Sequence, residues 1–522
     1  MHEMEWLLLA LMLAVAGLSV VARLVRVPYP ILLVLGGLVL GFVPGMPAVE
    51  LPPELVLVAF LPPLLYWSGF FSSPRDLRSD ARTISLLAVG LVLATTVAVA
   101  VAAMAMVDEM TWPVAFALGA IVSPTDPLAA GEIGRRLGVP RRLLTVLEGE
   151  SLVNDATALV AYRVAVTAAV TGSFVAWQAG LRFVVGAAGG VAVGLVVGWL
   201  VAELRRRLDD PVVEIVISVI SGYVAYLPAE LLGVSGVLAA VTTGLYLGWR
   251  APDLASASTR LLGFSFWEVL VYLANAVLFI LVGLQLHPIL DALGGAAVAV
   301  LVGQGALVSA VVVAVRLGWG FSVPYLVRLV DRRPSQAMRR VGAKGRLLLG
   351  WSGMRGAVSL AAALALPLDF PMRNLILFLT FSVIFATLVV QGLTLPALIR
   401  RLRLEQDDVE EREEVKARLA ATYAALERLD ELAGADWTRD DTVERLHGLY
   451  EFRRRRLKAR GGYLEDDDGA EDRSQAYQRL LRELLQAQRQ AIVRLRNQGR
   501  ISNDVMHRIE RELDLEDTRL EI

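Results

Sequence analysis

The sequence contains no cysteine among its 522 residues. This absence excludes disulfide bonds, thiol nucleophiles and cysteine-ligated metal centres. The sequence also lacks a surplus of positive charge, because 51 lysines and arginines are balanced by 52 acidic residues, for a formal net charge of −1. Without such a surplus the chain has little means of neutralising phosphates, so we expect no nucleic-acid partner.

Long apolar runs are what the sequence has in excess. Hydrophobic residues make up 56% of the chain, and the mean hydropathy is +0.56. Roughly 20 apolar residues cross a bilayer at ~1.5 Å per residue, and no small-residue cleavage site marks the first run as a signal peptide. We therefore predict an all-α protein embedded in membrane lipids, with about thirteen transmembrane helices at residues 5–23, 28–44, 53–71, 83–106, 112–136, 141–170, 180–203, 212–230, 234–249, 265–287, 294–317, 346–366 and 373–399.

The loops between these spans differ in charge. Lysine and arginine are retained on the cytoplasmic side of a membrane. One set of alternate loops has almost no cation beyond Arg182 and Arg373. This alternation predicts a multi-pass protein of the plasma membrane with its N-terminus outside and its C-terminus in the cytoplasm. The arginine-rich loops of the other set carry Arg23 and Arg26, Arg75, Arg78 and Arg82, Arg135, Arg136, Arg141 and Arg142, Arg205 to Arg207, Arg250 and Arg260, and a cluster from Arg328 to Arg346.

The composition changes abruptly near residue 400. Residues 400–522 are charged and rich in Ala, Leu, Arg and Glu, with apolar residues at helical spacing. We expect a transmembrane domain over 1–399 followed by a cytosolic helical domain over 400–522. No phosphate-binding glycine loop or metal motif occurs in the second domain, so we expect no cofactor. Whether it serves assembly or regulation stays open, and no regulatory partner is indicated.

The fifth predicted span carries prolines on both sides of Thr125 and Asp126. Pro124 and Pro127 lack an N–H and clash with carbonyls one turn back, so they should interrupt the helix. Freed carbonyls at membrane depth are tolerated only where protein, water or ions satisfy them. With the Thr125 hydroxyl and the Asp126 carboxylate they form an all-oxygen environment that suits a small hard cation. The alternative is a simple proline kink with a snorkelling aspartate.

The sixth predicted span holds three carboxylates, Glu148, Glu150 and Asp155. Each charge in a membrane costs on the order of 3 kcal/mol, so these groups must face protein or a water-filled cavity. Asp155 lies roughly 20 Å into the span, near the midplane. Ser151 is four residues before Asp155 and therefore shares its helix face.

Within the twelfth predicted span, the stretch Gly350–Leu360 places three glycines around a single arginine, Arg355. Arginine is effectively always protonated, and we expect Arg355 to pair with Glu150, which leaves Asp155 free to titrate. Spans five and twelve are seven apart and so cross the membrane in opposite directions. Two interrupted segments in inverted positions predict a transporter with inverted repeats and a site where two broken helices cross.

Four motifs in these spans carry a family resemblance: Phe60-Leu-Pro-Pro-Leu-Leu65, Ser123-Pro-Thr-Asp-Pro127, Glu148-Gly-Glu-Ser-Leu-Val-Asn-Asp-Ala-Thr157 and Gly353-Met-Arg-Gly-Ala-Val-Ser359. With them the chain resembles the monovalent cation/proton antiporters, in the branch of the sodium/proton exchangers. The resemblance implies a homodimer, in which Asp155 binds ion and proton. It implies that Asp126, Thr125 and Ser151 complete or shape the site, supported by Ser123 and Asn154, and that Glu150 and Arg355 form a structural pair. Because Asn154 precedes the key aspartate, it also implies electroneutral, one-for-one exchange.

Several alternatives stay open at the level of sequence. Na⁺, Li⁺ and K⁺ all accept oxygen ligands, and a cation-coupled symporter of an organic anion could share the inverted repeats. A channel is disfavoured because the sequence has no glycine and carbonyl signature of a selectivity filter. An enzyme is disfavoured because the spans contain no pair of nucleophile and base. Glu148 could line a funnel or lie at the interface, and Arg163 is expected in a structural ion pair. Glu214 and Glu268 are expected to snorkel at span ends.

Overall fold

The structure is a computed structural model that describes residues 2–25, 27–43, 53–172, 176–293, 298–330, 341–404, 409–460 and 470–520. Two parts of the predicted arginine-rich loops lie outside the described residues: Arg26 and residues 331–340. The chain divides into two compact units, Met1–Gln406 and Asp407–Ile522. Every regular element in the described ranges is a helix, as the sequence predicts.

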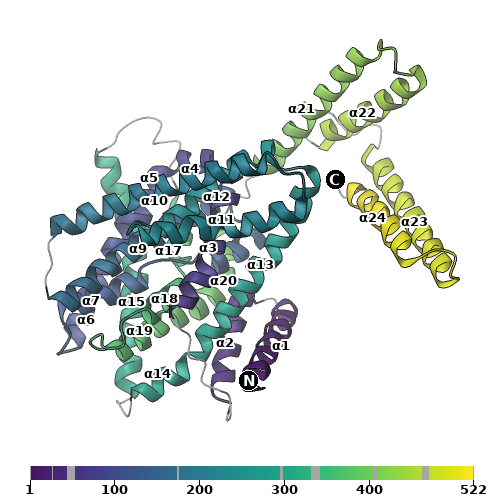
Figure 1. Ribbon diagram of the computed structural model, residues 1–522. Helices are drawn as coiled ribbons and strands as arrows, with labels where there is room; N and C mark the ends of the chain where they lie inside the picture. The colour runs from purple at the N-terminus through teal and green to yellow at the C-terminus, as the bar shows by residue number, and fades with distance from the viewer. Residues whose placement is uncertain are drawn as a thin grey trace. The chain divides into compact units, whose positions relative to one another are not determined.

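The first unit contains two groups of helices that come from alternating stretches of the chain (Figure 1). Bundle 1 consists of α1 (His2–Val25), α2 (Tyr29–Gly41), α3 (Pro53–Phe71), α10 (Ala176–Arg205), α11 (Pro211–Leu231), α12 (Gly236–Leu254) and α13 (Ala257–Leu284). Bundle 2 consists of α4 (Pro74–Ser79), α5 (Ala81–Ser85), η1 (Leu86–Leu91), α6 (Val92–Met106), α7 (Trp112–Val122), α8 (Leu128–Arg136), α9 (Arg141–Thr171), α15 (Val298–Val330), α17 (Ala343–Trp351), α18 (Ala357–Leu364), α19 (Arg373–Phe385), η2 (Ala386–Gln391) and α20 (Gly392–Leu402). The short helix α14 (Leu286–Ala292) packs on α19 and α2.

Each of the thirteen predicted spans coincides with one helix or with two or three consecutive helical elements, which supports the prediction of a helical membrane protein. Six of the described helical segments are long and apolar enough to cross a membrane, and shorter apolar helices accompany them. The largest misjudged boundary is that of the predicted span 294–317, because α15 continues to Val330. Its apolar composition persists through Val327, so the apolar segment extends ten residues beyond the end of the predicted span.

Local sequence signals set where the helices of bundle 1 begin. The Asp210 carboxylate accepts hydrogen bonds from the N–H groups of Val212 and Val213 and so caps α11. Ser235 caps α12 in the same way. A Cβ at Gly244 would lie 2.2 Å from the Tyr66 carbonyl oxygen, so only glycine lets α12 approach α3 this closely.

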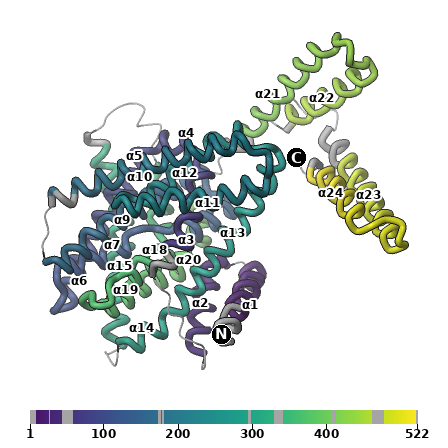
Figure 2. Tube along the Cα trace, in the orientation of Figure 1, coloured from purple at the N-terminus to yellow at the C-terminus, as the bar shows by residue number. Residues whose placement is uncertain are grey.

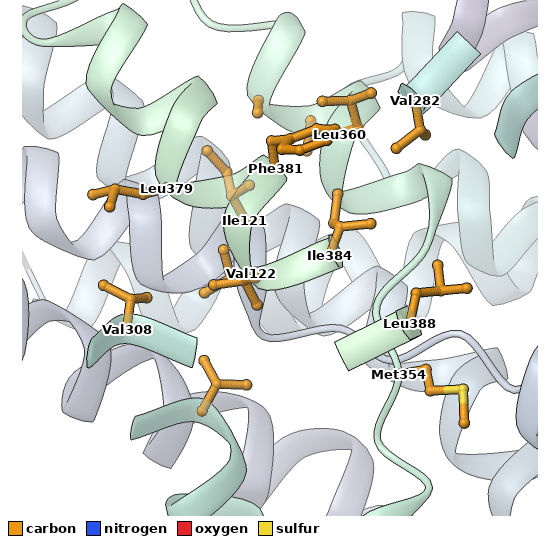
Figure 3. Packing of buried hydrophobic residues seen from close by; sticks show 14 of the residues in the cluster. Ile121, Val122, Val282, Val308, Met354, Leu360, Leu379, Phe381, Ile384 and Leu388 are labelled. Carbon is orange, nitrogen blue, oxygen red and sulfur yellow. The ribbon is translucent and has the colours of Figure 1, made fainter. Parts of the chain in front are cut away.

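Apolar side chains fill bundle 2. Figure 3 shows Ile121 and Val122 of α7 among Val308 of α15 and the α19 residues Leu379 and Ile384. All five side chains are almost wholly buried. This packing holds the two interrupted segments, α7–α8 and α17–α18, against a continuous apolar interior.

The described residues of the second unit form four charged helices, drawn in green to yellow in Figure 2: α21 (Val409–Leu432), α22 (Asp440–Arg460), α23 (Ala470–Asn497) and α24 (Asn503–Leu520). α21 packs on α22 through Val415, Leu419 and Leu457. α23 packs on α24, where the Arg489 guanidinium bonds Asp517 and Asp514, and these bonds raise the pKa of Arg489. The role of this unit stays a prediction.

Candidate functional site

The two interrupted helices meet at their breaks. The backbone N–H of Asp126, in the break between α7 and α8, donates to the Met354 carbonyl oxygen over 2.8 Å, in the break between α17 and α18. The Nε of Arg355 donates to the Val122 carbonyl oxygen over 3.0 Å. A Cβ at Gly356 would lie 2.0 Å from Oδ2 of Asp126, so a glycine is required for this approach. The crossing that the prolines and glycines predict is formed.

The side chains of Asp126 and Arg355 compensate the partial charges of the four helix ends at the crossing. Helix N-termini carry partial positive charge and C-termini partial negative charge. The Asp126 carboxylate accepts the N–H of Leu128 over 2.9 Å at the start of α8 and also lies against Gly356, at the start of α18. Arg355 donates to the carbonyl oxygens of Val122, at the end of α7, and Gly353, just beyond α17. Each charge therefore stabilises two converging half-helices.

The predicted ion pair between Glu150 and Arg355 is wrong. Glu150 pairs with Arg316 of α15, whose Nη1 and Nη2 donate to Oε1 and Oε2 over 2.5 and 2.8 Å. Both side chains are 2% exposed, and the Nε of Arg316 donates to the Leu349 carbonyl oxygen. Arg355 is drawn instead to the carbonyl groups that the breaks leave free. The sequence did not indicate Arg316 as a partner because the predicted eleventh span ends at residue 317, which places Arg316 at the membrane boundary.

A hydrogen-bond chain connects Glu150 to the first break. The Thr125 hydroxyl donates to Oε1 of Glu150 over 3.0 Å and accepts from Nδ2 of Asn154 over 2.8 Å. Oδ1 of Asn154 is buried and has no hydrogen-bond partner among the described residues. The predicted supporting role of Asn154 thus corresponds to fixing α9 against the break. Ser123 only donates to the Ala120 carbonyl oxygen of its own helix.

A cavity of about 570 Å³ lies between the two bundles. Bundle 1 lines it from α3 and α13, and bundle 2 from the first break, α9 and α18. Its inner wall includes Asp155, Asp126, Thr125 and Ser151, so the structure brings together the four residues predicted to hold the ion. The Asp155 side chain is mostly buried, and within the described part of the chain its carboxylate forms no hydrogen bond or ion pair.

The mouth of the cavity carries charge of both signs. Arg135 and Glu148 pair there over 2.6 Å with exposed side chains, next to the arginine-rich loops. Glu148 therefore lines the entrance, one of its two predicted positions. Glu268 also lines the cavity and is exposed, but it lies eleven residues after the start of α13 and not at the end of the helix, where it was expected.

Two other charges lie away from the cavity. Arg163 forms an ion pair with Glu230 of α11, which agrees with its expected structural pairing. Glu214 does not snorkel as expected, because it is 1% exposed and bonds Arg205 over 3.0 Å and the Thr259 hydroxyl over 3.2 Å. A buried carboxylate needs such partners, and sequence spacing alone did not reveal them.

Comparison with known proteins gives three findings. The sequence model of the family described as "Sodium/hydrogen exchanger, transmembrane" matches residues 9–401. An uncharacterized Na⁺/H⁺ exchanger of Mycobacterium tuberculosis is 38% identical over 98% of this chain and 95% of its own length. The Na⁺/H⁺ antiporter ApNhaP of Aphanothece halophytica is 34% identical over 82% of this chain and 79% of its own length.

A further relative and a solved structure extend the comparison. A Bacillus pumilus protein named as a sodium, potassium, lithium and rubidium/H⁺ antiporter is 32% identical over 75% of this chain and 60% of its own length. The fold resembles that of the sodium proton antiporter MjNhaP1 from Methanocaldococcus jannaschii, with a TM-score of 0.58 and 21% identity. That match covers 77% of this chain and 99% of the other.

Proposed function

Because this chain belongs to the sodium/hydrogen exchanger family, we propose that it exchanges Na⁺ or another small monovalent cation for H⁺, with Asp155 as the shared binding group. Family membership makes the chain a membrane transporter of the antiporter class and not an enzyme. The observation that carries the proposal is a buried carboxylate, unpaired among the described residues, at the inner wall of a cavity beside two broken helices that cross. An intramembrane acid without a protein partner is by default a functional group.

The exchange follows from competition for one carboxylate. Proton and cation each neutralise Asp155, and neither can bind while the other occupies it. A bare carboxylate is costly to carry through the low-dielectric barrier between the two facing states. If only the neutralised forms cross, each cation moved one way requires a proton moved the other way.

The stoichiometry follows from which groups change charge. Glu150 is committed to Arg316, and Asp126 to the starts of α8 and α18. Asn154 is neutral and donates to Thr125. Asp155 is then the group that titrates, so we expect one proton for one cation.

Alternating access assigns a role to each bundle. Bundle 2, with both broken helices, moves against bundle 1, and the cavity between them changes the side on which it opens. We expect the arginine-rich loops in the cytoplasm, so that the mouth at Arg135 and Glu148 faces inward and the N-terminus lies outside. We also expect a homodimer in the plasma membrane, which mass determination of the detergent-solubilised protein tests.

The cation is a small alkali ion, with Na⁺ first. The site offers oxygen atoms, and the names of the relatives include sodium and, in one, potassium, lithium and rubidium. Symport of an organic anion is disfavoured. Arg135 is the cationic side chain that lines the cavity within the described residues, and Glu148 already neutralises it.

The test is proton movement in everted membrane vesicles from a host that lacks its own antiporters. Na⁺, Li⁺ and K⁺ are added in turn at mildly acidic to mildly alkaline pH. The proposal expects cation-dependent proton efflux for at least one of them, at a rate that an imposed membrane potential leaves unchanged. A potential-dependent rate would refute one-for-one exchange, and no proton movement with any cation would refute antiport.

A further inference from the structure

One buried hydroxyl at the cavity, that of Ser359, has no hydrogen-bond partner among the described residues. Ser359 lies on the first turn of α18 and is 1% exposed. It lines the same cavity as Asp155 and Asp126. Three other buried hydroxyls have no partner among the described residues, those of Tyr66, Thr95 and Thr380, and none of them lines this cavity.

The break in the helix explains why the Ser359 hydroxyl is free. Several other buried hydroxyls of bundle 2 donate to the carbonyl oxygen four residues earlier, such as Ser309 to Gly305, Ser352 to Leu348 and Thr387 to Val383. Four residues before Ser359 is Arg355, which lies in the break and not in α18. A buried hydroxyl without a partner costs about 1–3 kcal/mol, so this oxygen is suited to a guest that supplies the missing interaction.

Ser359 and Asp155 line the same cavity. The preceding residue, Val358, packs against the apolar cluster that includes Leu152 and Ala156, on either side of Asp155 in α9. We propose that Oγ of Ser359 is a neutral oxygen ligand of the transported cation and helps to select which cation binds. This inference rests on the proposed exchange function and deepens it. The hydroxyl contributes to cation binding only, because a proton on Asp155 needs no further ligand.

The test uses two serines on either side of the same break. Ser359→Ala removes the ligand, Ser359→Thr keeps the hydroxyl, and Ser352→Ala removes a buried hydroxyl that already has a partner. We measure the half-saturating concentrations of Na⁺, Li⁺ and K⁺ for exchange. As a readout of binding without transport, we also measure the rise in melting temperature that each cation causes in the purified protein.

We expect Ser359→Ala to raise the half-saturating concentration of the preferred cation about tenfold, the worth of one ordinary hydrogen bond, with the maximal rate retained. The ratio between cations should change, Ser359→Thr should recover the affinity, and Ser352→Ala should leave it unaltered. Unchanged affinity and unchanged cation-induced stabilisation in Ser359→Ala would overturn the inference, as would equal effects of both alanine variants. A wild type without cation-driven proton movement would instead refute the proposed function.

A separate observation concerns how the two bundles are held together. Nη2 of Arg163, on α9 of bundle 2, donates to Oε2 of Glu230, on α11 of bundle 1. Oε1 of Glu230 accepts the N–H of Gly236 over 3.1 Å, which fixes this carboxylate at the corner between α11 and α12. The other ion pairs of the first unit whose partners are both described stay within a single bundle or, in α14, within one helix.

This pair lies on the far side of Asp155 from the mouth of the cavity. Arg163 follows Asp155 by eight residues, about 12 Å along α9, whereas the mouth is at Arg135 and Glu148. We infer that Arg163 and Glu230 form a latch that keeps the outer side closed while the cavity is open inward. Opening outward requires the two bundles to part there, so the pair must break in each cycle. This inference also rests on the proposed function.

The expected effect follows from the exposure of the pair. Its side chains are 48% and 26% exposed, and such pairs shift an equilibrium by up to about fivefold. Arg163→Gln or Glu230→Gln should therefore increase the outward-facing population by up to about fivefold. The half-saturating cation concentration at the outer face, measured in right-side-out vesicles, should fall by up to that factor. In everted vesicles the half-saturating cation concentration should rise, but by a smaller factor. The double variant should give the same values as the single variants.

A reversible cross-link tests the latch directly, because the chain has no cysteine of its own. Arg163→Cys with Glu230→Cys is joined by a short reagent that reacts with two thiols and is cleaved by reductant. The control joins Asp76→Cys with Arg141→Cys, which replaces an exposed pair inside bundle 2. We expect the first cross-link to stop exchange until reductant is added and the control to leave exchange intact. Full exchange through the first cross-link would overturn the latch, as would equal affinities at both faces in the glutamine variants.

Discussion

Arg316→Met is the change that most sharply separates the observed ion pair from the one expected from sequence. It leaves Glu150 at 2% side-chain exposure, with the Thr125 hydroxyl as its remaining hydrogen-bond donor among the described residues. Removing one member of a buried pair costs about 3–5 kcal/mol, because the other charge is left uncompensated. Adding Glu150→Gln removes that charge, so the double variant should recover most of the lost stability.

The assay is a double-mutant cycle on the unfolding free energy of the purified protein in detergent. A parallel cycle combines Arg355→Met with Glu150→Gln. Since Arg355 donates to Val122 and Gly353 and not to Glu150, the second cycle should show far smaller coupling. Strong coupling of Glu150 to Arg355 together with weak coupling to Arg316 would refute the structural assignment and restore the expectation from sequence.

Three further predictions concern the crossing and the buried network. Gly356→Ala places a methyl group against the Asp126 carboxylate and should abolish exchange, whereas Gly303→Ala, in open space, should leave proton efflux unaffected. Thr125→Val removes one donor to a buried carboxylate and should cost about 1–3 kcal/mol of unfolding free energy, with Thr125→Ser recovering most of it. Glu214→Gln breaks a buried ion pair and should lower the melting temperature, while the cation affinity of the protein that remains folded is unchanged.

The sequence predicts most of the architecture because its strongest signals are local. Apolar runs of bilayer length mark the helices, and Pro124 and Pro127 place one break to the residue. The inverted positions of the two breaks predict their crossing, and Thr125, Ser151 and Asp155 then reach one cavity.

The partners of the charges could not be predicted in the same way. Whether Glu150 meets Arg316 or Arg355 depends on how α15 packs against α9, and helical spacing carries no information on that contact. The same holds for Glu230, which lies at the end of its span and meets Arg163 across the two bundles. The apolar run beyond residue 317 was the one signal that could have placed Arg316 inside the membrane.

The central claim is that one carboxylate, Asp155, carries both the cation and the proton. Its most direct test is Na⁺-driven proton efflux in everted vesicles that contain equal amounts of wild type, Asp155→Asn and Asp155→Glu. We expect efflux from the wild type, none from Asp155→Asn, and a measurable rate with altered affinity from Asp155→Glu, which keeps the titrating group. Efflux from Asp155→Asn at the wild-type rate would show that Asp155 is not the shared binding group.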